Sequence, residues 1–242
     1  MWTRSELKAR AKTRFKANYW KCVLVAFILM LVSGGFSAGS NAKNASDTTE
    51  SITIDFDHPE QALMELQELS NSPEVQAAMR VVRTMSLLMT VLGLLVFNPL
   101  VVGCKNFFRR NTAVEADTNE LSVAFKPNWI RNVLGMFLRG LFTGLWALLF
   151  IIPGIVKAYS YRMVPYIMAE DPDIDALDAI TKSRRMMNGH KWNTFVLDLS
   201  FLGWAILTVV TLGLAGIFYV FPYKEATEAE LFQALKRENA EY

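Results

Sequence analysis

Long apolar stretches alternate with charged blocks along this sequence. The apolar runs cover residues 22–35, 84–103, 132–152, 155–169 and 194–221. A helix needs about 20 mainly apolar residues to cross about 30 Å of hydrocarbon. A helix of a soluble protein would instead carry a polar face in every turn. The pattern therefore predicts an all-α fold, a polytopic transmembrane helical bundle in a single membrane domain over residues 1–242.

The segment 1–20 before the first apolar run predicts a cytoplasmic amphipathic helix. Thr3 and Glu6 have the spacing of a capping box. Apolar residues recur on one face of this helix, at Leu7, Ala11 and Phe15. Basic residues cover the remaining faces, which is typical of helices that lie on an anionic membrane surface. We expect such docking, and a solvated basic leader to the first span is the alternative.

The segment 38–82 differs in kind because acidic residues dominate it. Between residues 40 and 74, eight acidic residues face a single base, Lys43. Residues 51–56 alternate like a short strand, and Pro59 suits the first position of a short helix. We expect this segment to form an acidic extracytoplasmic loop. Further on, Asn98-Pro99 predicts a kink in the second span.

Charge sets the predicted topology, because short loops rich in Lys and Arg stay in the cytoplasm. The N-terminal segment and residues 104–131 and 182–191 are basic, whereas 40–72 is acidic. Two loops on one side need an even number of crossings between them, so we expect hairpins that turn at Pro153-Gly154 and near Leu212-Gly213. About six spans with both termini cytoplasmic follow. Four long spans, in which each hairpin is one helix, are the alternative.

Composition supplies no sign of catalytic chemistry. The chain is 52% hydrophobic and 20% charged, and its net charge of +2 does not indicate nucleic-acid binding. Cys22 and Cys104 lie near predicted cytoplasmic ends of apolar runs, where we expect packed, reduced thiols. His58 and His190 fall on opposite sides of the predicted membrane. No motif for catalysis, a metal or a cofactor is present, so we expect a protein that is not an enzyme.

Ionisable residues inside the predicted spans are the strongest candidates for function. Arg139, Arg162 and Asp198 fall at similar depths near the cytoplasmic side. An unpaired charge in hydrocarbon is costly, so we expect Asp198 to pair with one arginine. Such a group forms either an intramembrane polar centre for an ion, headgroup or proton, or a structural clamp between helices.

The segment 170–193 predicts a cytoplasmic interfacial helix. Asp175 and Asp178 have the spacing of a helix start, and Gly189 suits its end. One side would carry Leu177, Ile180, Arg184 and Met187. Four basic side chains are candidate contacts for lipid headgroups, namely Lys182, Arg184, Arg185 and Lys191.

Several of these segments resemble a family of bacterial integral membrane proteins catalogued as domain of unknown function 975. The resemblance covers nearly the whole chain except 40–72. It rests on Tyr19-Trp20, Leu145–Ile155, Tyr159–Met163, Pro165–Ile167, Ser183–Trp192, Phe195–Trp204 and Pro222-Tyr223. It implies a multi-pass protein of the bacterial cytoplasmic membrane, and it supplies no activity or binding residues.

These observations leave two main hypotheses for function. The first is a non-enzymatic membrane protein that scaffolds partners or binds lipids with anionic headgroups, alone, as a homo-oligomer or with another membrane protein. The alternative is a small transporter or channel that uses the polar centre. A lipid-modifying membrane enzyme is a third hypothesis, and the sequence lacks the paired acids or interfacial histidine that it would need.

Overall fold

The structure is a computed structural model of the chain and describes residues 2–34, 71–126 and 129–240. Every regular element in these ranges is helical, which confirms the all-α class. In chain order the elements are α1 (Arg4–Ala17), α2 (Tyr19–Val32), α4 (Pro73–Leu92), the π-helical η1 (Gly93–Phe97), α5 (Asn98–Asn111), the 3-10 helix η2 (Thr118–Phe125), α6 (Trp129–Leu149), α7 (Ile151–Ser160), α8 (Val164–Glu170), α9 (Ala176–Met186), α10 (Lys191–Leu199), α11 (Leu202–Val210), the π-helical η3 (Gly216–Val220) and α12 (Phe221–Ala240). The predicted strand at 51–56, the helix from Pro59 and most of the acidic segment lie outside the described residues.

The chain divides into two compact units, one of Met1–Ser33 with Leu94–Tyr242 and one of Gly34–Gly93. In the described part of the smaller unit, α4 begins with Pro73 at its first position. The Ser72 hydroxyl caps it by accepting a hydrogen bond from the Val75 backbone N–H at 3.3 Å. No residue of α4 is buried.

A π-helical segment lies directly before Asn98-Pro99, where the sequence predicts a kink. Pro99 lies in the first turn of α5, directly after η1, and the helical run continues from Pro73 to Asn111. A proline removes one backbone donor and crowds the preceding turn, and a π-bulge accommodates both effects.

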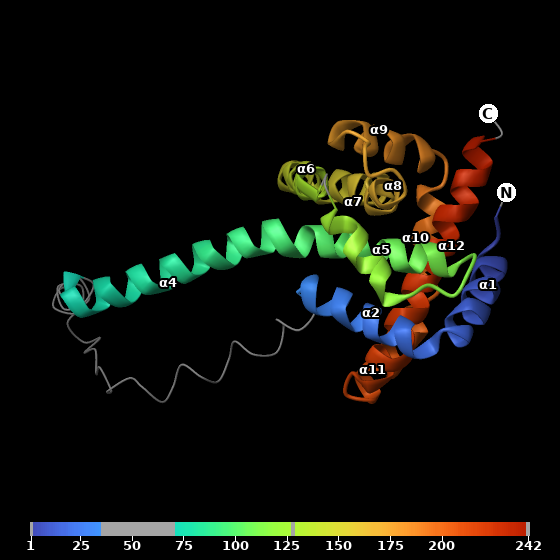
Figure 1. Cartoon of the computed structure of the whole chain (residues 1–242), viewed down its shortest axis with the longest axis horizontal. Helices are drawn as coiled ribbons and strands as arrows, with labels where there is room; N and C mark the ends of the chain where they lie inside the picture. Colours follow the sequence, from blue (N-terminus) through green and yellow to red (C-terminus); the bar gives the residue numbers. More distant parts are fainter. Residues whose placement is uncertain (1, 35–70, 127–128, 241–242) are drawn as a thin grey trace. The chain divides into compact units, whose positions relative to one another are not determined.

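The central helix of the larger unit is α12, drawn in red in Figure 1. It packs against α1, α2, α5 and α9. Its enclosed positions are mainly small or apolar, at Ala226, Ala229, Leu231, Phe232, Ala234 and Leu235. Small residues let neighbouring helices approach closely. As a result, a helix that also carries several acids is surrounded by protein over most of its length.

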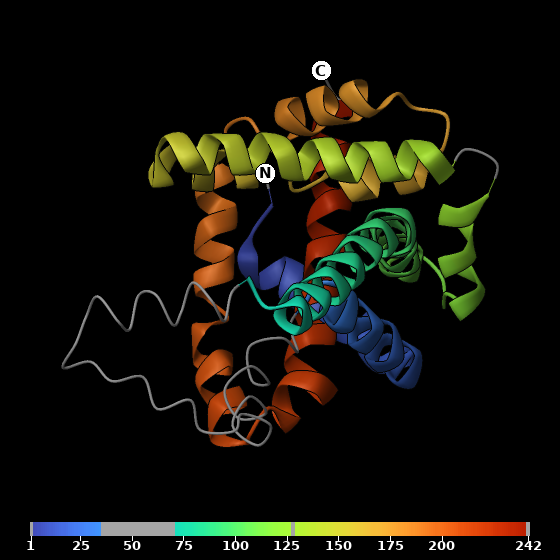
Figure 2. The ribbon, with the colours of Figure 1, turned by 90° about the vertical axis from the view of Figure 1, so that its left-hand side faces the viewer.

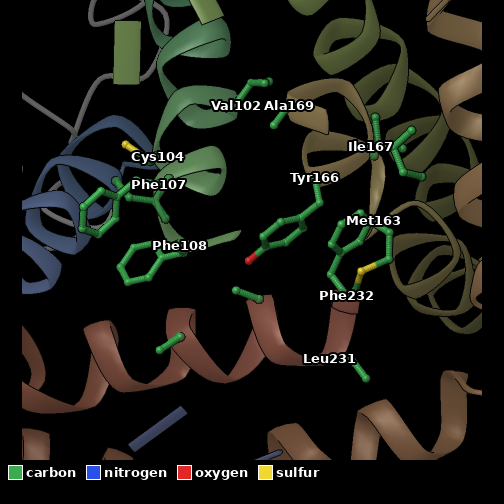
Figure 3. Packing of buried hydrophobic residues seen from close by; sticks show 14 of the residues in the cluster. Val102, Cys104, Phe107, Phe108, Met163, Tyr166, Ile167, Ala169, Leu231 and Phe232 are labelled. Atoms are coloured by element: carbon green, nitrogen blue, oxygen red, sulfur yellow. The ribbon is translucent and has the colours of Figure 1, made fainter. Parts of the chain in front are cut away.

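An apolar core forms where α5, α8 and α12 meet (Figure 3). Phe107 and Phe108 of α5 are buried, and their rings meet edge to face with centroids 5.3 Å apart. Tyr166 of α8 stacks on Phe232 of α12 at 5.2 Å. Aromatic pairs in such geometries contribute about 0.5–1.5 kcal/mol beyond their burial. This core fixes α12 against α5 and α8.

The N-terminal helix α1 forms as its cap predicts, but its apolar face is used differently. The Thr3 hydroxyl accepts a hydrogen bond from the Glu6 backbone N–H at 3.3 Å. The stripe of Leu7, Ala11 and Phe15 is fully buried, and α1 packs on α12. The expectation that α1 docks on a membrane surface is therefore wrong for this apolar face, because the protein itself covers it. The basic faces of α1 remain exposed.

The first predicted hairpin forms with its turn earlier than expected. Phe150 is extended, with φ −154° and ψ 138°, and it separates α6 from α7. Pro153 lies inside the first turn of α7, a position that proline tolerates because its missing N–H has no partner there. The two helices pack closely, since a Cβ added at Gly154 would lie 2.6 Å from the Cα of Ala147.

The second predicted hairpin turns at the expected residues. Leu212 and Gly213 adopt left-handed backbone conformations, with φ of 51° and 90°. The Thr211 hydroxyl accepts a hydrogen bond from the Ala215 backbone N–H at 3.0 Å, and α11 packs against η3. In Figure 2, α10 and α11 (orange) run beside η3 and α12 (red) and join them at this turn. Neither predicted hairpin forms the single long helix of the four-span alternative.

Six crossings are not confirmed. Among the described residues, the stretches long and apolar enough to cross a membrane are Pro73–Asn111, Trp129–Leu149 and Lys191–Val210. A fourth candidate arises if α1 and α2, bent by 106°, form one broken span. With 10 and 7 residues, α7 and α8 reach only about 15 and 10 Å at 1.5 Å per residue. Figure 2 also shows α6 lying across the direction of α10 and α11.

Candidate functional site

Charged side chains from three helices and one turn form a network centred on α12. Arg162, in the turn between α7 and α8, donates Nη2–H to Asp198 Oδ1 at 3.0 Å and Nε–H to Glu228 Oε1 at 2.8 Å. Lys105 of α5 donates its Nζ–H groups to Glu228 Oε2 at 2.7 Å and to Glu225 Oε2 at 2.6 Å. Each cation therefore bridges two carboxylates, and the network ties α5, α10 and α12 together.

Asp198 has further partners at the edge of this network. The Tyr159 hydroxyl donates a hydrogen bond to Asp198 Oδ2 at 2.9 Å. Lys224 Nζ lies 3.8 Å from Asp198 Oδ1, and this lysine is partly exposed. An arginine, a tyrosine and a lysine thus surround one carboxylate, as buried charges require.

The two acids of α12 differ in how well their charge is compensated. Burial opposes ionisation of Glu228, but the cations of Lys105 and Arg162 outweigh it and hold its pKa well below the usual range. Burial raises the pKa of Glu225, and the negative charge of Glu228 raises it further; among the described residues its ion pair is with Lys105. Stability from ionised Glu228 is therefore fully present at neutral pH and is lost only as the pH falls below the ordinary carboxyl range.

Arg139 of α6 lines the same pocket as this network but takes no part in its ion pairs. Within the described part of the chain, no carboxylate oxygen lies within 4.0 Å of its guanidinium. The expected pairing of Asp198 with an arginine is thus made by Arg162. The structure brings all three predicted residues of the polar centre around one space.

That space is a pocket of about 440 Å³, which we call the polar pocket. Its charged lining consists of Lys105, Arg139, Arg162, Lys224, Asp198, Glu225 and Glu228. Four cations and three carboxylates leave a formal surplus of one positive charge. Apolar side chains from α2, α5 and α7 form another part of the wall, namely Leu29, Val101 and Ala158, and Ser33 and Tyr159 also line it.

A second pocket, the basic pocket, lies between α7, α9 and the start of α10. Its volume is about 450 Å³, and its lining consists of Lys157, Ser160, Thr181, Arg184, Arg185, Asn188 and Lys191. This lining contains four cations and no acid. Three of the four predicted headgroup residues are brought together here, whereas Lys182 is exposed elsewhere on α9.

Local hydrogen bonds hold α9 in the position in which Arg184 and Arg185 line this pocket. Asp175 caps the helix, its carboxylate accepting a hydrogen bond from the Leu177 backbone N–H at 3.1 Å. The buried Ser183 hydroxyl donates to the Ser160 carbonyl at 2.8 Å and accepts from the Met163 N–H at 3.2 Å. Figure 1 shows α9 beside α6 and α8.

The prediction of which residues share one side of α9 is partly wrong. Leu177 is 53% exposed, and the buried face consists of Ala176, Ala179, Ile180, Ser183 and Met186. Arg184, assigned to the side of Ile180, is exposed as well. Small residues allow close contact with neighbouring helices, so the helix turns its alanines and Ser183 inward. Helical structure within 170–193 covers the end of α8, all of α9 and the start of α10.

Sequence reasoning missed several members of the polar pocket, above all Lys105, Glu225 and Glu228. A signal for the acids exists in α12, where Glu225 and Glu228 are three positions apart and alternate with buried Ala226 and Ala229. Acids interspersed with alanines on a helix indicate a buried, paired face rather than a solvated one.

Among the described residues no group of three or more potential metal ligands occurs. Both cysteines are buried as free thiols.

The ion pair between Arg162 and Asp198 can be tested by a double-mutant cycle. Asp198→Ala leaves part of the half-buried Arg162 guanidinium unpaired; removing one partner of a fully buried pair costs about 3–5 kcal/mol, which is the upper limit here. We expect a clear drop in thermal stability in detergent for Asp198→Ala and for Arg162→Ala, and a double variant that loses less than the sum. The Asp198/Arg139 cycle is the matched control and should be additive. Additive losses in the Arg162 cycle would contradict the pairing.

Comparison with known proteins gives one match. Neither a curated protein nor a solved structure matches the chain significantly. Residues 148–239 match the model of a family described as "Protein of unknown function (DUF975)". The matched stretch contains Arg162, Asp198 and Glu228, whereas Tyr19-Trp20 lies outside it. Over residues 148–239 the chain is therefore similar to the DUF975 family.

Proposed function

We propose that this chain is a non-enzymatic, multi-pass membrane protein that binds anionic lipid headgroups in its basic pocket. The observation that carries the proposal is the lining of that pocket by four cations without an acid. Arginine presents a planar fork of donors that matches phosphate oxygens, and lysine adds a compact charge. Thr181 and Asn188 add uncharged polar groups to the same wall.

The surroundings of the basic pocket suit a lipid better than a soluble anion. Trp192, next to Lys191, is 71% exposed, and tryptophan favours the level of lipid headgroups. Ile155 and Val156 of α7 are exposed beside the pocket residue Lys157, so acyl chains would find apolar surface there. A phosphate in the pocket could therefore keep its lipid tails against protein.

We further propose that both termini lie in the cytoplasm and that the acidic segment 38–82 lies outside. The support is the charge distribution, because basic segments are retained on the cytoplasmic side. The basic pocket would then face the leaflet that carries most anionic lipid.

A small transporter or channel is the second candidate function. The observation that favours it is the polar pocket, in which Arg139, Arg162 and Asp198 line one space of about 440 Å³. Arg162 and Asp198 form an ion pair with each other, however, which favours a structural clamp between helices. A flux of small anions through liposomes containing the protein would support this candidate over the first.

Lipid binding is tested with purified protein in mixed micelles of nonionic detergent and phosphatidylglycerol. A ligand that binds only the folded state raises the midpoint of thermal unfolding. We expect this rise in the wild type and a loss of about half or more of it in the Arg184→Gln/Arg185→Gln/Lys191→Gln variant. Added salt should weaken the effect, because it screens charges over about 8–10 Å.

Lys182→Gln is the matched control, because this lysine lies on the same helix but outside the pocket. It should respond like the wild type. An equal response of the wild type to phosphatidylcholine, or a loss in Lys182→Gln as large as in the triple variant, would overturn the proposed function.

The topology is tested by labelling intact cells with a membrane-impermeant maleimide. Ser46→Cys should react directly, because the acidic segment is placed outside. Ser5→Cys should react only after the cells are permeabilised. The native thiols of Cys22 and Cys104 are buried and should stay silent. Reaction of Ser5→Cys but not Ser46→Cys in intact cells would invert the proposed orientation.

A further inference from the structure

Arg139 is a cation in an apolar helix, and among the described residues no carboxylate oxygen lies within 4.0 Å of its guanidinium. It lies within the candidate span Trp129–Leu149 and lines the polar pocket. Glu228, which lines the same pocket, already accepts from Lys105 at Oε2 and from Arg162 at Oε1. Asp198 is likewise held by Arg162 and the Tyr159 hydroxyl.

Charge accounting in the polar pocket therefore leaves Arg139 as the surplus. Lys105 is paired with Glu225 and Glu228, and Lys224 lies 3.8 Å from Asp198. Ionisable groups in apolar segments are costly and usually pair or contact a ligand. A bound anion would supply the counter-charge that the described lining of the pocket lacks.

The dimensions and walls of the pocket favour a bound molecule over a single small ion. A volume of about 440 Å³ falls within the range of about 300–1,000 Å³ typical of ligand sites. The apolar wall of Leu29, Val101 and Ala158 lies beside the charged one. The pocket thus offers one anion-binding group together with space for an uncharged remainder.

We propose that the polar pocket binds an oxyanion, a phosphate or carboxylate group, and that Arg139 is its recognition residue. The planar guanidinium can donate two parallel hydrogen bonds to such a group. Arg162 and Lys105 cannot take this role, because their donors hold α10 and α12 in place. This site is separate from the basic pocket and does not depend on the proposed lipid function.

The proposal is tested by thermal unfolding of the full chain in nonionic detergent with three probes. The probes are acetate, inorganic phosphate and short-chain phosphatidic acid, each compared with chloride at equal ionic strength. At least one probe should raise the unfolding midpoint saturably in the wild type. A response to acetate or phosphate identifies a free solute as the source, and a response to phosphatidic acid alone identifies a lipid headgroup.

The variants separate recognition by Arg139 from general effects of charge. Arg139→Gln should weaken probe affinity about tenfold or more, because a charged hydrogen bond contributes about 1.5–3 kcal/mol. Arg139→Lys should weaken it less, since it keeps the charge but loses the fork. Arg131→Gln, on the same helix but outside the pocket, should bind like the wild type.

Repeating the titrations in the Arg184→Gln/Arg185→Gln/Lys191→Gln background removes the basic pocket as a source of binding. Probe binding that persists in this background and is weakened by Arg139→Gln supports the proposal. The proposal is overturned if no probe shifts the wild type relative to chloride, or if all binding is lost in this background. It is also overturned if both Arg139→Lys and Arg139→Gln bind like Arg131→Gln. Should Arg139→Gln fail to fold, the comparison of Arg139→Lys with Arg131→Gln decides.

Discussion

The rest of the larger unit depends on the double ion pair of Glu228 with Lys105 and Arg162. Glu228 is only 8% exposed, and a buried carboxylate is tolerated when opposite charges and hydrogen bonds compensate it. The two cations come from α5 and from the turn between α7 and α8, so neutralising Glu228 also fixes these elements on α12. Because α12 contacts α1 and α2 as well, one compensated charge organises most of the helices around it.

The sequence was informative where a single physical constraint dominated. Arg139, Arg162 and Asp198 could be grouped because charges at similar depth in apolar segments must find partners, and the cap at Thr3 and the turn at Leu212-Gly213 follow from local chemistry. Lys105 and Glu228 could not be paired, since they are 123 positions apart and lie in segments that read as solvated. The number of membrane crossings could not be predicted from the distribution of charges either, because α7 and α8 are short helices that pack on neighbouring helices.

The two pockets differ in the way their charge is balanced. In the polar pocket, carboxylates from α10 and α12 satisfy all cations except Arg139, so the site is mainly structural with one group left for recognition. In the basic pocket the lining supplies no counter-charge, so a bound anion would reduce the mutual repulsion among its cations. The charge arrangement of the polar pocket stabilises the fold without a ligand, whereas that of the basic pocket favours binding of an anion.

The central claim is that Glu228 is the anion on which the helices assemble, and the most direct measurement compares Glu228→Gln with Glu225→Gln in thermal unfolding at neutral pH. Glu225 lies one turn away on the same helix and contacts the same lysine, so it is a matched control. The account predicts that Glu228→Gln destabilises the protein by about 3–5 kcal/mol, because buried Lys105 and half-buried Arg162 lose their shared partner. It also predicts that Glu225→Gln costs clearly less. A loss in Glu225→Gln equal to or greater than that in Glu228→Gln would contradict the account.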